Sequence, residues 1–259
     1  MARELTRVLG GIFKPQHYAS LLRSRVYVDW KESFLKRYVL QRGTYPYVCR
    51  VRTPMGIVSL ELHCPEDAFT VQEVFGLDCY RANHERVIVD FGANIGISAA
   101  YFLSRHPEAR VHCFEPLHSN AAKLRHNLSP FAGRFTLAEV AVADFDGELS
   151  FLVEPTGRYS GIDNTRGEEQ RVPCVNANRV LQEIIRTHGR IDLLKVDVEG
   201  AEAMFMPKLT PQILEKIGLI YLEGRDAFRN PQFAASKSIS GVLRYSRVSA
   251  RTTMQALRQ

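Results

Sequence analysis

The sequence has no uninterrupted apolar run of the length that a membrane-spanning helix needs, about 18 residues. Its basic start, residues 1–18, also lacks an apolar segment followed by a small-residue cleavage site, so no secretory signal is expected. The chain contains no internal repeat and no low-complexity tract. Hydrophobic residues make up 45% of the 259 residues and charged residues 24%, which argues against a disordered chain and for ordinary globular structure.

Cysteine is scarce and scattered. The five cysteines are odd in number and show no C-x-x-C spacing, so neither a disulfide framework nor a cysteine zinc site is indicated. A reducing cytoplasm is therefore the expected compartment. The cysteines are Cys49, Cys64, Cys79, Cys113 and Cys174.

The net charge of +6 is unevenly distributed. Residues 1–52 carry 11 Lys and Arg against 3 Asp and Glu, and residues 225–259 carry 7 against 1. The part between them, 53–224, carries 16 against 24. Two basic ends of this kind can attract nucleic acid, anionic lipid or a phosphorylated substrate. The alternative is that these dispersed basic residues only form solvated surfaces.

Residues 1–65 are expected to form an extension that precedes the main domain, 66–259. The extension begins as a basic helical leader, in which Trp30, Phe34 and Tyr38 recur at the spacing of one helix face. Residues 47–53 and 57–63 then alternate in polarity on either side of a Pro-x-Gly turn, which predicts a β-hairpin.

From Arg86 onward the pattern changes to alternating strands and helices, which predicts an α/β domain with a mostly parallel sheet. Short apolar runs of this type are typical of strands that are buried on both faces. The residues after Arg225 give no clear pattern. Strands are expected at 87–91, 110–115, 135–141, 148–154, 171–175, 191–197 and 219–223, and helices at 95–105, 119–128, 179–188 and from about 200.

The sharpest motif runs from a buried strand into a glycine turn and then a helix, at residues 87–96. Gly92 and Gly96 allow the backbone to bend and to approach a ligand closely. Asn94 stands where a dinucleotide fingerprint has its second glycine. This difference argues against a nicotinamide dinucleotide as the cofactor and favours S-adenosylmethionine. Asp90, at the strand end, is a candidate for holding the amino end of the methionine moiety. Structural glycines without a ligand are the alternative.

Two further segments suit a bound nucleoside. Glu115 ends the next strand, 19 residues after Gly96, where open α/β sites use an acid to bond ribose hydroxyls. Small residues at Val142 and Ala143 leave room for a flat ring, and their backbone groups are candidates for contacting adenine. Each feature also has a plain structural alternative: Glu115 as a solvated acid, and Asp144 as the start of a turn.

Three ionisable residues, Lys195, Asp197 and Glu199, lie at the end of the apolar strand 191–197. Charges at such a position are costly unless they are paired or used. Their coupling is expected to shift pKa values toward those that a proton acceptor needs. An internal ion-pair network that only shapes the site is the alternative.

Together these motifs resemble the FkbM family of S-adenosylmethionine-dependent methyltransferases over about residues 66–225. The matching residues are Val-Asp-Phe-Gly-Ala-Asn-Ile-Gly at 89–96, Phe-Glu-Pro at 114–116, Ala-Val-Ala-Asp at 141–144 and Lys-Val-Asp-Val-Glu-Gly-Ala-Glu at 195–202. The resemblance implies a Rossmann-like class I methyltransferase fold, with a seven-stranded sheet whose last strand is antiparallel. It also implies that S-adenosyl-L-methionine is bound by Asp90, Gly92, Ala93, Asn94, Gly96, Ile97, Glu115, Pro116, Val142 and Ala143.

The implied reaction is methylation of a hydroxyl on a sugar, a glycan or a secondary metabolite. Glu199 and Asp197 are the candidate bases, Lys195 would organise them or stabilise a developing alkoxide, and Glu223 is a secondary candidate. No metal is assigned, although acids here could hold magnesium. Asn176-Ala-Asn178 replaces an acidic run of the family, so no role of those acids carries over.

Two other functions stay open. An RNA-directed methyltransferase would use the basic ends, but no aromatic clamp for a base follows strand 191–197, so nucleic acid is the less favoured partner. A non-catalytic nucleotide-binding module is the third hypothesis. The acceptor, the oligomeric state and the roles of the basic ends are not specified by the sequence. The lid over the site is expected to come from residues 1–60 and 155–170, with Arg158, Tyr159 and Arg166 available for an anionic or sugar ligand.

Overall fold

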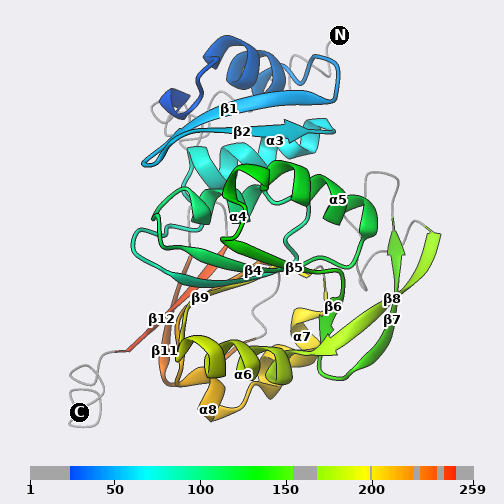
Figure 1. Ribbon diagram of the computed structural model, residues 1–259, viewed down its shortest axis with the longest axis vertical. Coiled ribbons are helices and arrows are strands. Elements are labelled where there is room, and N and C mark those ends of the chain that lie inside the picture. Colours follow the sequence, from blue (N-terminus) through cyan, green and yellow to red (C-terminus); the bar gives the residue numbers. More distant parts are fainter. Residues whose placement is uncertain (1–23, 154–167, 199, 224–227, 238–241, 249–259) are drawn as a thin grey trace. The chain divides into compact units, whose positions relative to one another are not determined.

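The computed structural model describes residues 24–153, 168–198, 200–223, 228–237 and 242–248 (Figure 1). The chain divides into two compact units, Met1–Arg81 and Ala82–Gln259. Within the described ranges, the structure has no helix whose length and apolar character would let it cross a membrane.

The first unit contains the predicted β-hairpin, formed by β1 (Tyr47–Thr53) and β2 (Gly56–Leu62), which pair antiparallel. The predicted aromatic stripe is confirmed: the ring of Phe34 stacks on Trp30 and on Tyr38, with centroids 5.7 and 5.3 Å apart. The other elements of this unit are η1 (Ser24–Val26), η2 (Lys31–Val39), α3 (Pro65–Val71) and η3 (Gln72–Gly76).

The first unit extends to Arg81, past the expected boundary after residue 65. A local contact explains why α3 stays with the hairpin: Asp67 Oδ2 accepts the N–H groups of His63 and Cys64 at 2.7 and 3.1 Å. A carboxylate that caps a helix start in this way satisfies otherwise unpaired donors and fixes the entry of the chain into the helix. The division at residues 65 and 66 stays a prediction.

The second unit is built on a seven-stranded sheet in the order β11-β12-β10-β9-β3-β4-β5. Neighbouring strands are parallel except where β12 pairs antiparallel with β10 and with β11. This is the Rossmann-like class I methyltransferase arrangement that the resemblance implies, so the fold class is confirmed. The strands are β3 (Val87–Phe91), β4 (Arg110–Phe114), β5 (Phe135–Ala138), β9 (Ile191–Val196), β10 (Ile217–Leu222), β11 (Phe233–Lys237) and β12 (Leu243–Arg247).

Helices cover both faces of this sheet: α4 and α5 lie on one face, and α6, α7 and α8 on the other (Figure 1). Apolar residues of the second group pack with the central strands in one core cluster. The amphipathic α6 has clear ends, because the side chain of Asn176 accepts the N–H of Arg179 and Gly189 follows at φ 82°. The helices are α4 (Ile97–Leu103), α5 (His118–Asn127), η4 (Ser129–Phe131), α6 (Ala177–His188), α7 (Glu202–Phe205), η5 (Met206–Lys208) and α8 (Pro211–Leu214).

One predicted strand is divided in the structure. Residues 135–141 were expected to be continuous, but β5 ends at Ala138 and β6 (Ala141–Ala143) starts a second, three-stranded sheet. The reason is a change of partner: β5 pairs with β4, whereas β6 pairs in parallel with β8 (Glu168–Asn176). On its other side β8 pairs antiparallel with β7 (Gly147–Val153).

The last two strands, β11 and β12, come from the segment whose sequence gave no clear pattern. They complete the edge of the sheet as two short strands of 5 residues each. In β11 only Phe233 is buried, and alanine, serine and lysine fill the rest. A strand with a single apolar contact lacks the alternation by which strands are recognised.

Candidate functional site

The glycine loop that follows β3 lies at the switch point of the sheet, since β4 and β9 flank β3 on opposite sides. Gly92 is left-handed at φ 76°, and a Cβ there would lie 1.7 Å from the backbone oxygen of Asp197. The N–H groups of Gly92 and Ala93 both donate to Phe114 O, at 3.0 and 3.1 Å. Glycine at residue 92 thus lets the loops after β3, β4 and β9 meet, in the crevice where α/β sheets bind ligands.

Side chains of helix α5 contact the second half of the loop and hold it in place. Asn94 is left-handed at φ 47°, and Gly96, at φ 86°, caps α4. A Cβ on Gly96 would lie 3.1 Å from Leu124 Cγ. The buried side chain of Asn127 donates to Ile95 O at 2.9 Å. The loop therefore has one defined shape, which suits a preformed ligand site.

Glu115 directly follows β4 and faces the glycine loop. Its Oε2 accepts the N–H of Asn94 at 2.9 Å, and its Oε1 accepts the N–H of Leu117 at 3.1 Å and the amide of Asn120 at 3.3 Å. A carboxylate has about four acceptor positions, so hydroxyl donors can still be accepted. Burial raises the pKa of Glu115 to about 7, although these three donors oppose the shift. The solvated-acid alternative is thereby ruled out for Glu115, which is buried.

Asp90 and Lys195 form a buried ion pair across strands β3 and β9. They are register partners, and Lys195 Nζ lies 3.0 Å from Asp90 Oδ1. The other carboxylate oxygen of Asp90 accepts the hydroxyl of Ser98 at 2.6 Å. Burial raises the pKa of Asp90 while Lys195 and Ser98 oppose it. The side chain of Asp90 is fully buried, and its two oxygens contact Lys195 and Ser98. This geometry favours a role in holding strands β3 and β9 together over direct contact with a methionine amino group.

The ammonium group of Lys195, which has three donors, lies close to oxygens of three other residues. These are Asp90 Oδ1, Gly92 O at 3.0 Å and Asp197 Oδ2 at 3.3 Å. Burial lowers the pKa of Lys195, but the nearby carboxylates of Asp90, Asp197 and Glu223 outweigh this and raise it overall. Lys195 is thus held as a cation that fixes the loops after β3 and β9. Of its two expected roles, organising the acids fits this geometry better than stabilising an alkoxide.

Asp197 is a candidate base whose side chain remains partly accessible. Its backbone N–H donates to Phe91 O at 3.1 Å, and its side chain is 30% exposed. Glu199 lies outside the described residues. Glu223, the secondary candidate, follows β10, where its N–H donates to Val196 O at 2.9 Å. Asp197 and Glu223 therefore lie beyond the carboxyl ends of adjacent strands.

The remaining predicted cofactor residues lie in α4, after β4 and in β6. Ile97 opens α4 and is buried, Pro116 is partly buried after Glu115, and Val142 and Ala143 are buried in β6. Because β6 is an edge strand of the three-stranded sheet, one side of its backbone is not used by that ladder. Asp144 begins the bend at residues 144–146 that joins β6 to β7, in line with the structural alternative. Its side chain also forms an ion pair with Lys208, which lowers the pKa of Asp144.

Three polar residues that form hydrogen bonds to this site were not predicted from the sequence. These are Ser98 on Asp90, Asn120 on Glu115 and Asn127 on Ile95. All three are buried. The available signal was weak: polar residues at the inner positions of α4 and α5, where apolar side chains would be expected.

The whole set of residues after β3, β4 and β9 falls within one family match. The profile of the methyltransferase FkbM domain matches residues 90–235. The chain belongs to the FkbM methyltransferase family. This membership confirms the resemblance drawn from the motifs.

Among its relatives, AMB antimetabolite synthetase AmbE of Pseudomonas aeruginosa is 27% identical over 236 residues, which is 75% of this chain and 11% of AmbE. The 2-O-methyltransferase NoeI of Sinorhizobium fredii is 33% identical over 156 residues, 54% of this chain and 63% of NoeI. The 31-O-demethyl-FK506 methyltransferase FkbM of Streptomyces tacrolimicus is 27% identical over 189 residues, 59% of this chain and 72% of that protein. The chain thus spans less than two thirds of AmbE and of NoeI.

Membership of the FkbM family and the class I fold imply use of S-adenosylmethionine. The residues fit that cofactor: the left-handed Gly92 and Gly96 leave both ends of the loop without a side chain, and Glu115 can accept ribose hydroxyls. Within the described ranges, no group of three or more His, Cys, Asp or Glu residues has the geometry of a metal site.

Proposed function

We propose that this FkbM family protein is an S-adenosylmethionine-dependent O-methyltransferase that acts on a hydroxyl of a saccharide or a secondary metabolite. The proposal rests on one observation: a candidate nucleoside site and a candidate acceptor site lie at the carboxyl ends of neighbouring strands of the sheet. Glu115 and the glycine loop form the nucleoside side, and the accessible Asp197, fixed by Lys195, forms the acceptor side. When bound, the cofactor supplies an activated methyl group on a sulfonium.

The protein's own contribution is alignment and proton removal. Holding an acceptor oxygen in line with the methyl group can lower the barrier by about 7–11 kcal/mol. An acceptor hydroxyl must also lose its proton, for which Asp197 or Glu199 is the proposed base. Lys195 keeps the carboxylate of Asp197 oriented, at 3.3 Å from Oδ2, without giving up its own proton.

The names of two relatives support oxygen as the accepting atom. One is called a 2-O-methyltransferase and the other a 31-O-demethyl-FK506 methyltransferase. The second name also gives the acceptor, 31-O-demethyl-FK506, which is a small molecule. For this chain a small molecule or glycan hydroxyl remains a proposal, as does a cytoplasmic location.

Substitutions on the two sides of the site should separate binding from turnover. Glu115→Ala removes the ribose acceptor, and we expect it to weaken S-adenosylmethionine binding by at least about tenfold. Asp197→Asn and Glu199→Gln remove the two candidate bases, and we expect both to keep binding, with the single-turnover rate falling by about 100-fold in the variant that lacks the base. Calorimetry with S-adenosylmethionine and release of S-adenosylhomocysteine from a panel of glycans and hydroxylated metabolites measure the two properties.

Equal losses of binding and turnover in all three variants would contradict this division of roles. Methylation of RNA, with an affinity that falls steeply with salt, would instead support the RNA-directed alternative. A folded protein that does not bind S-adenosylmethionine would support the non-catalytic alternative.

Cofactor binding should also depend on pH through Glu115. With a pKa of about 7 in the protein without ligand, Glu115 becomes protonated as the pH falls below 7, and a protonated acid accepts two ribose hydroxyls poorly. We therefore expect the dissociation constant of S-adenosylmethionine to rise by about tenfold per pH unit below pH 7 and to level off above it. Calorimetry from pH 5.5 to 8.5 measures this, with Glu115→Gln as control. A wild-type profile as flat as that of the Gln variant would refute the assignment.

A further inference from the structure

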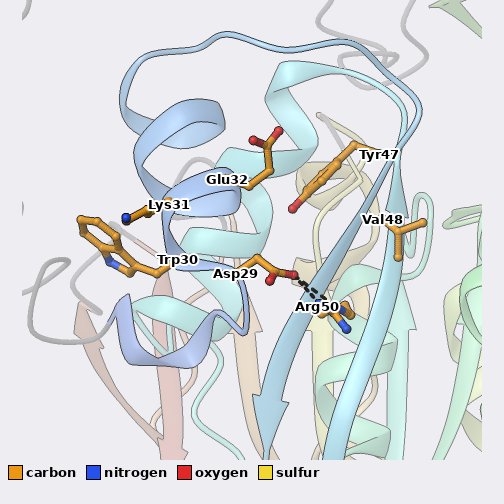
Figure 2. A pocket seen from close by; sticks show the side chains of 7 residues that line it. All are labelled: Asp29, Trp30, Lys31, Glu32, Tyr47, Val48 and Arg50. Carbon is orange, nitrogen blue, oxygen red and sulfur yellow. Dashed lines mark hydrogen bonds and ion pairs between the residues drawn. The ribbon is translucent and has the colours of Figure 1, made fainter.

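Polar side chains that the proposed reaction does not yet explain occur in both units. In the first unit they line a surface hollow of about 690 Å³ between the start of η2 and strand β1 (Figure 2). The ring of Trp30 points away from the Asp29–Arg50 ion pair in this hollow, so the two do not face one ligand. In the second unit, by contrast, the buried Ser98 contacts Asp90, which belongs to the candidate functional site.

Ser98 is the first member of a chain of polar contacts that ends at Asp197. Its hydroxyl donates to Asp90 Oδ2 at 2.6 Å. The other oxygen of Asp90 lies 3.0 Å from Lys195 Nζ, which in turn lies 3.3 Å from Asp197 Oδ2. Ser98, Asp90 and Lys195 are at most 5% exposed, whereas the side chain of Asp197 is 30% exposed. The buried end of the chain can therefore influence the accessible end through the charges between them.

The fold explains why the Ser98 hydroxyl reaches Asp90. Ser98 lies in the first turn of α4, directly after the glycine loop, and α4 packs on β3. The rest of α4 is buried and carries aliphatic or aromatic side chains. A hydroxyl in such surroundings is costly unless it is hydrogen-bonded. Here its partner is a carboxylate, and a hydrogen bond to an ionised group is about twice as strong as a neutral one.

The hydroxyl of Ser98 favours the charged form of Asp90. Burial raises the pKa of Asp90, whereas the ammonium of Lys195 and the hydrogen bond from Ser98 oppose this shift. Without the hydroxyl, Asp90 would take up a proton at a higher pH. Lys195 would then lose a carboxylate partner, and its positive charge would act more strongly on Asp197. A carboxylate bound by such a cation accepts a proton less readily.

We propose that Ser98 is a positioning residue for methyl transfer: by holding Asp90 as the charged partner of Lys195, it leaves Asp197 available as the proton acceptor. This inference rests on the proposed function, with Asp197 as the base. Ser98 touches neither the acceptor nor the cofactor in this scheme and acts through two buried side chains. The acceptor hydroxyl gives its proton to Asp197, while Lys195 and Ser98 keep their protons throughout.

The other titratable groups around this chain do not reproduce the effect. Cys113 on β4 stays a neutral thiol, because burial raises its pKa. Glu223, after β10, contributes a negative charge that acts on Lys195. Glu115, with a pKa of about 7, changes charge with or without the hydroxyl of Ser98. Each variant is therefore compared with the wild type at the same pH and with saturating S-adenosylmethionine.

Ser98→Ala and Ser104→Ala form a matched pair for the test. Both serines are buried and belong to α4 or its end, but Ser104 donates to Tyr101 O at 2.7 Å and lies outside the chain of contacts. Single-turnover methyl transfer is measured from pH 5.5 to 8.5 with an acceptor found in the panel described above. We expect Ser98→Ala to lower the rate by about tenfold at pH 5.5, with a loss that shrinks as the pH rises and Asp90 becomes charged.

The stability of Ser98→Ala should follow the opposite trend. A protonated Asp90 depends on the hydroxyl less than an ionised one does. The folded variant keeps a proton on Asp90 that the folded wild type has released, so its loss of stability relative to wild type should grow as the pH rises. Urea unfolding over the same pH range measures this. Ser104→Ala should turn over as the wild type does, with a loss of stability that does not change with pH.

Opposite pH trends in turnover and stability would not arise from lost packing. The inference alone is overturned if the wild type is active but the losses in Ser98→Ala are independent of pH, or if Ser104→Ala loses turnover equally. Ser98→Cys keeps the side-chain size with only a weak donor, so it should show the same trends and replaces Ser98→Ala if that variant does not fold. A wild type that transfers no methyl group would overturn the proposed function, and with it the role of Ser98 in turnover, even if the stability trend remains.

Discussion

Replacing Gly92 by alanine should destabilise the second unit and abolish cofactor binding together. The new Cβ would lie 1.7 Å from the backbone oxygen of Asp197, and the residue would have to keep φ 76°. Backbone cannot move aside as a flexible side chain does, so the loops after β3 and β9 must separate. We expect a loss of about 4 kcal/mol in the free energy of unfolding, measured in urea. Calorimetry should show no binding of S-adenosylmethionine.

Gly133→Ala is the matched control for this substitution. Gly133 has nearly the same backbone angle, φ 79°, but nothing lies within 4 Å of its added Cβ. It should therefore lose only the left-handed backbone preference, about 1 kcal/mol, and bind cofactor normally. Similar losses of stability in both variants would mean that backbone angle, rather than the contact with Asp197, makes Gly92 necessary.

The central strands of the fold could be predicted because each is a short apolar run, which by itself indicates a buried strand. Strands β3 and β9 are short apolar runs, and both are buried along most of their length. Strand β11 could not be predicted, since its stability comes from pairing with β12 (Ala235 with Tyr245) rather than from its own side chains. The end of β5 at Ala138 was missed for a related reason: the choice between β4 and β8 as partner depends on residues distant in sequence.

The candidate site, too, could be predicted only where local sequence determines the structure. Glycine spacing correctly marked the loop at 92–96 as a place of close approach, because left-handed backbone and missing side chains are properties of glycine itself. The role of Asp90 could not be read in this way. Whether a strand-end acid faces a ligand or a buried cation depends on which residue the neighbouring strand places opposite. Here it is Lys195, 105 residues later, through the pairing of β3 with β9.

Lys195→Met should cause the second large loss. Methionine fills similar space but leaves Asp90 buried with only Ser98 as a partner. Breaking a buried ion pair from one side typically costs about 3–5 kcal/mol, and we expect a loss of this size in urea unfolding. Turnover should fall as well, since Asp197 loses the cation that orients it. Lys216→Met, on an exposed lysine of the same unit, should change neither property.

The pH dependence of Lys195→Met distinguishes a lost charge partner from lost packing. Without the ammonium, burial raises the pKa of Asp90 further above its unfolded value of about 4. Folded protein then holds a proton that the unfolded chain has released, so stability relative to wild type should fall as the pH rises from about 4 to 8. Adding Asp90→Asn removes the titrating group and should flatten this slope and recover part of the stability. A loss that is independent of pH and unchanged by Asp90→Asn would show that Lys195 acts through packing alone.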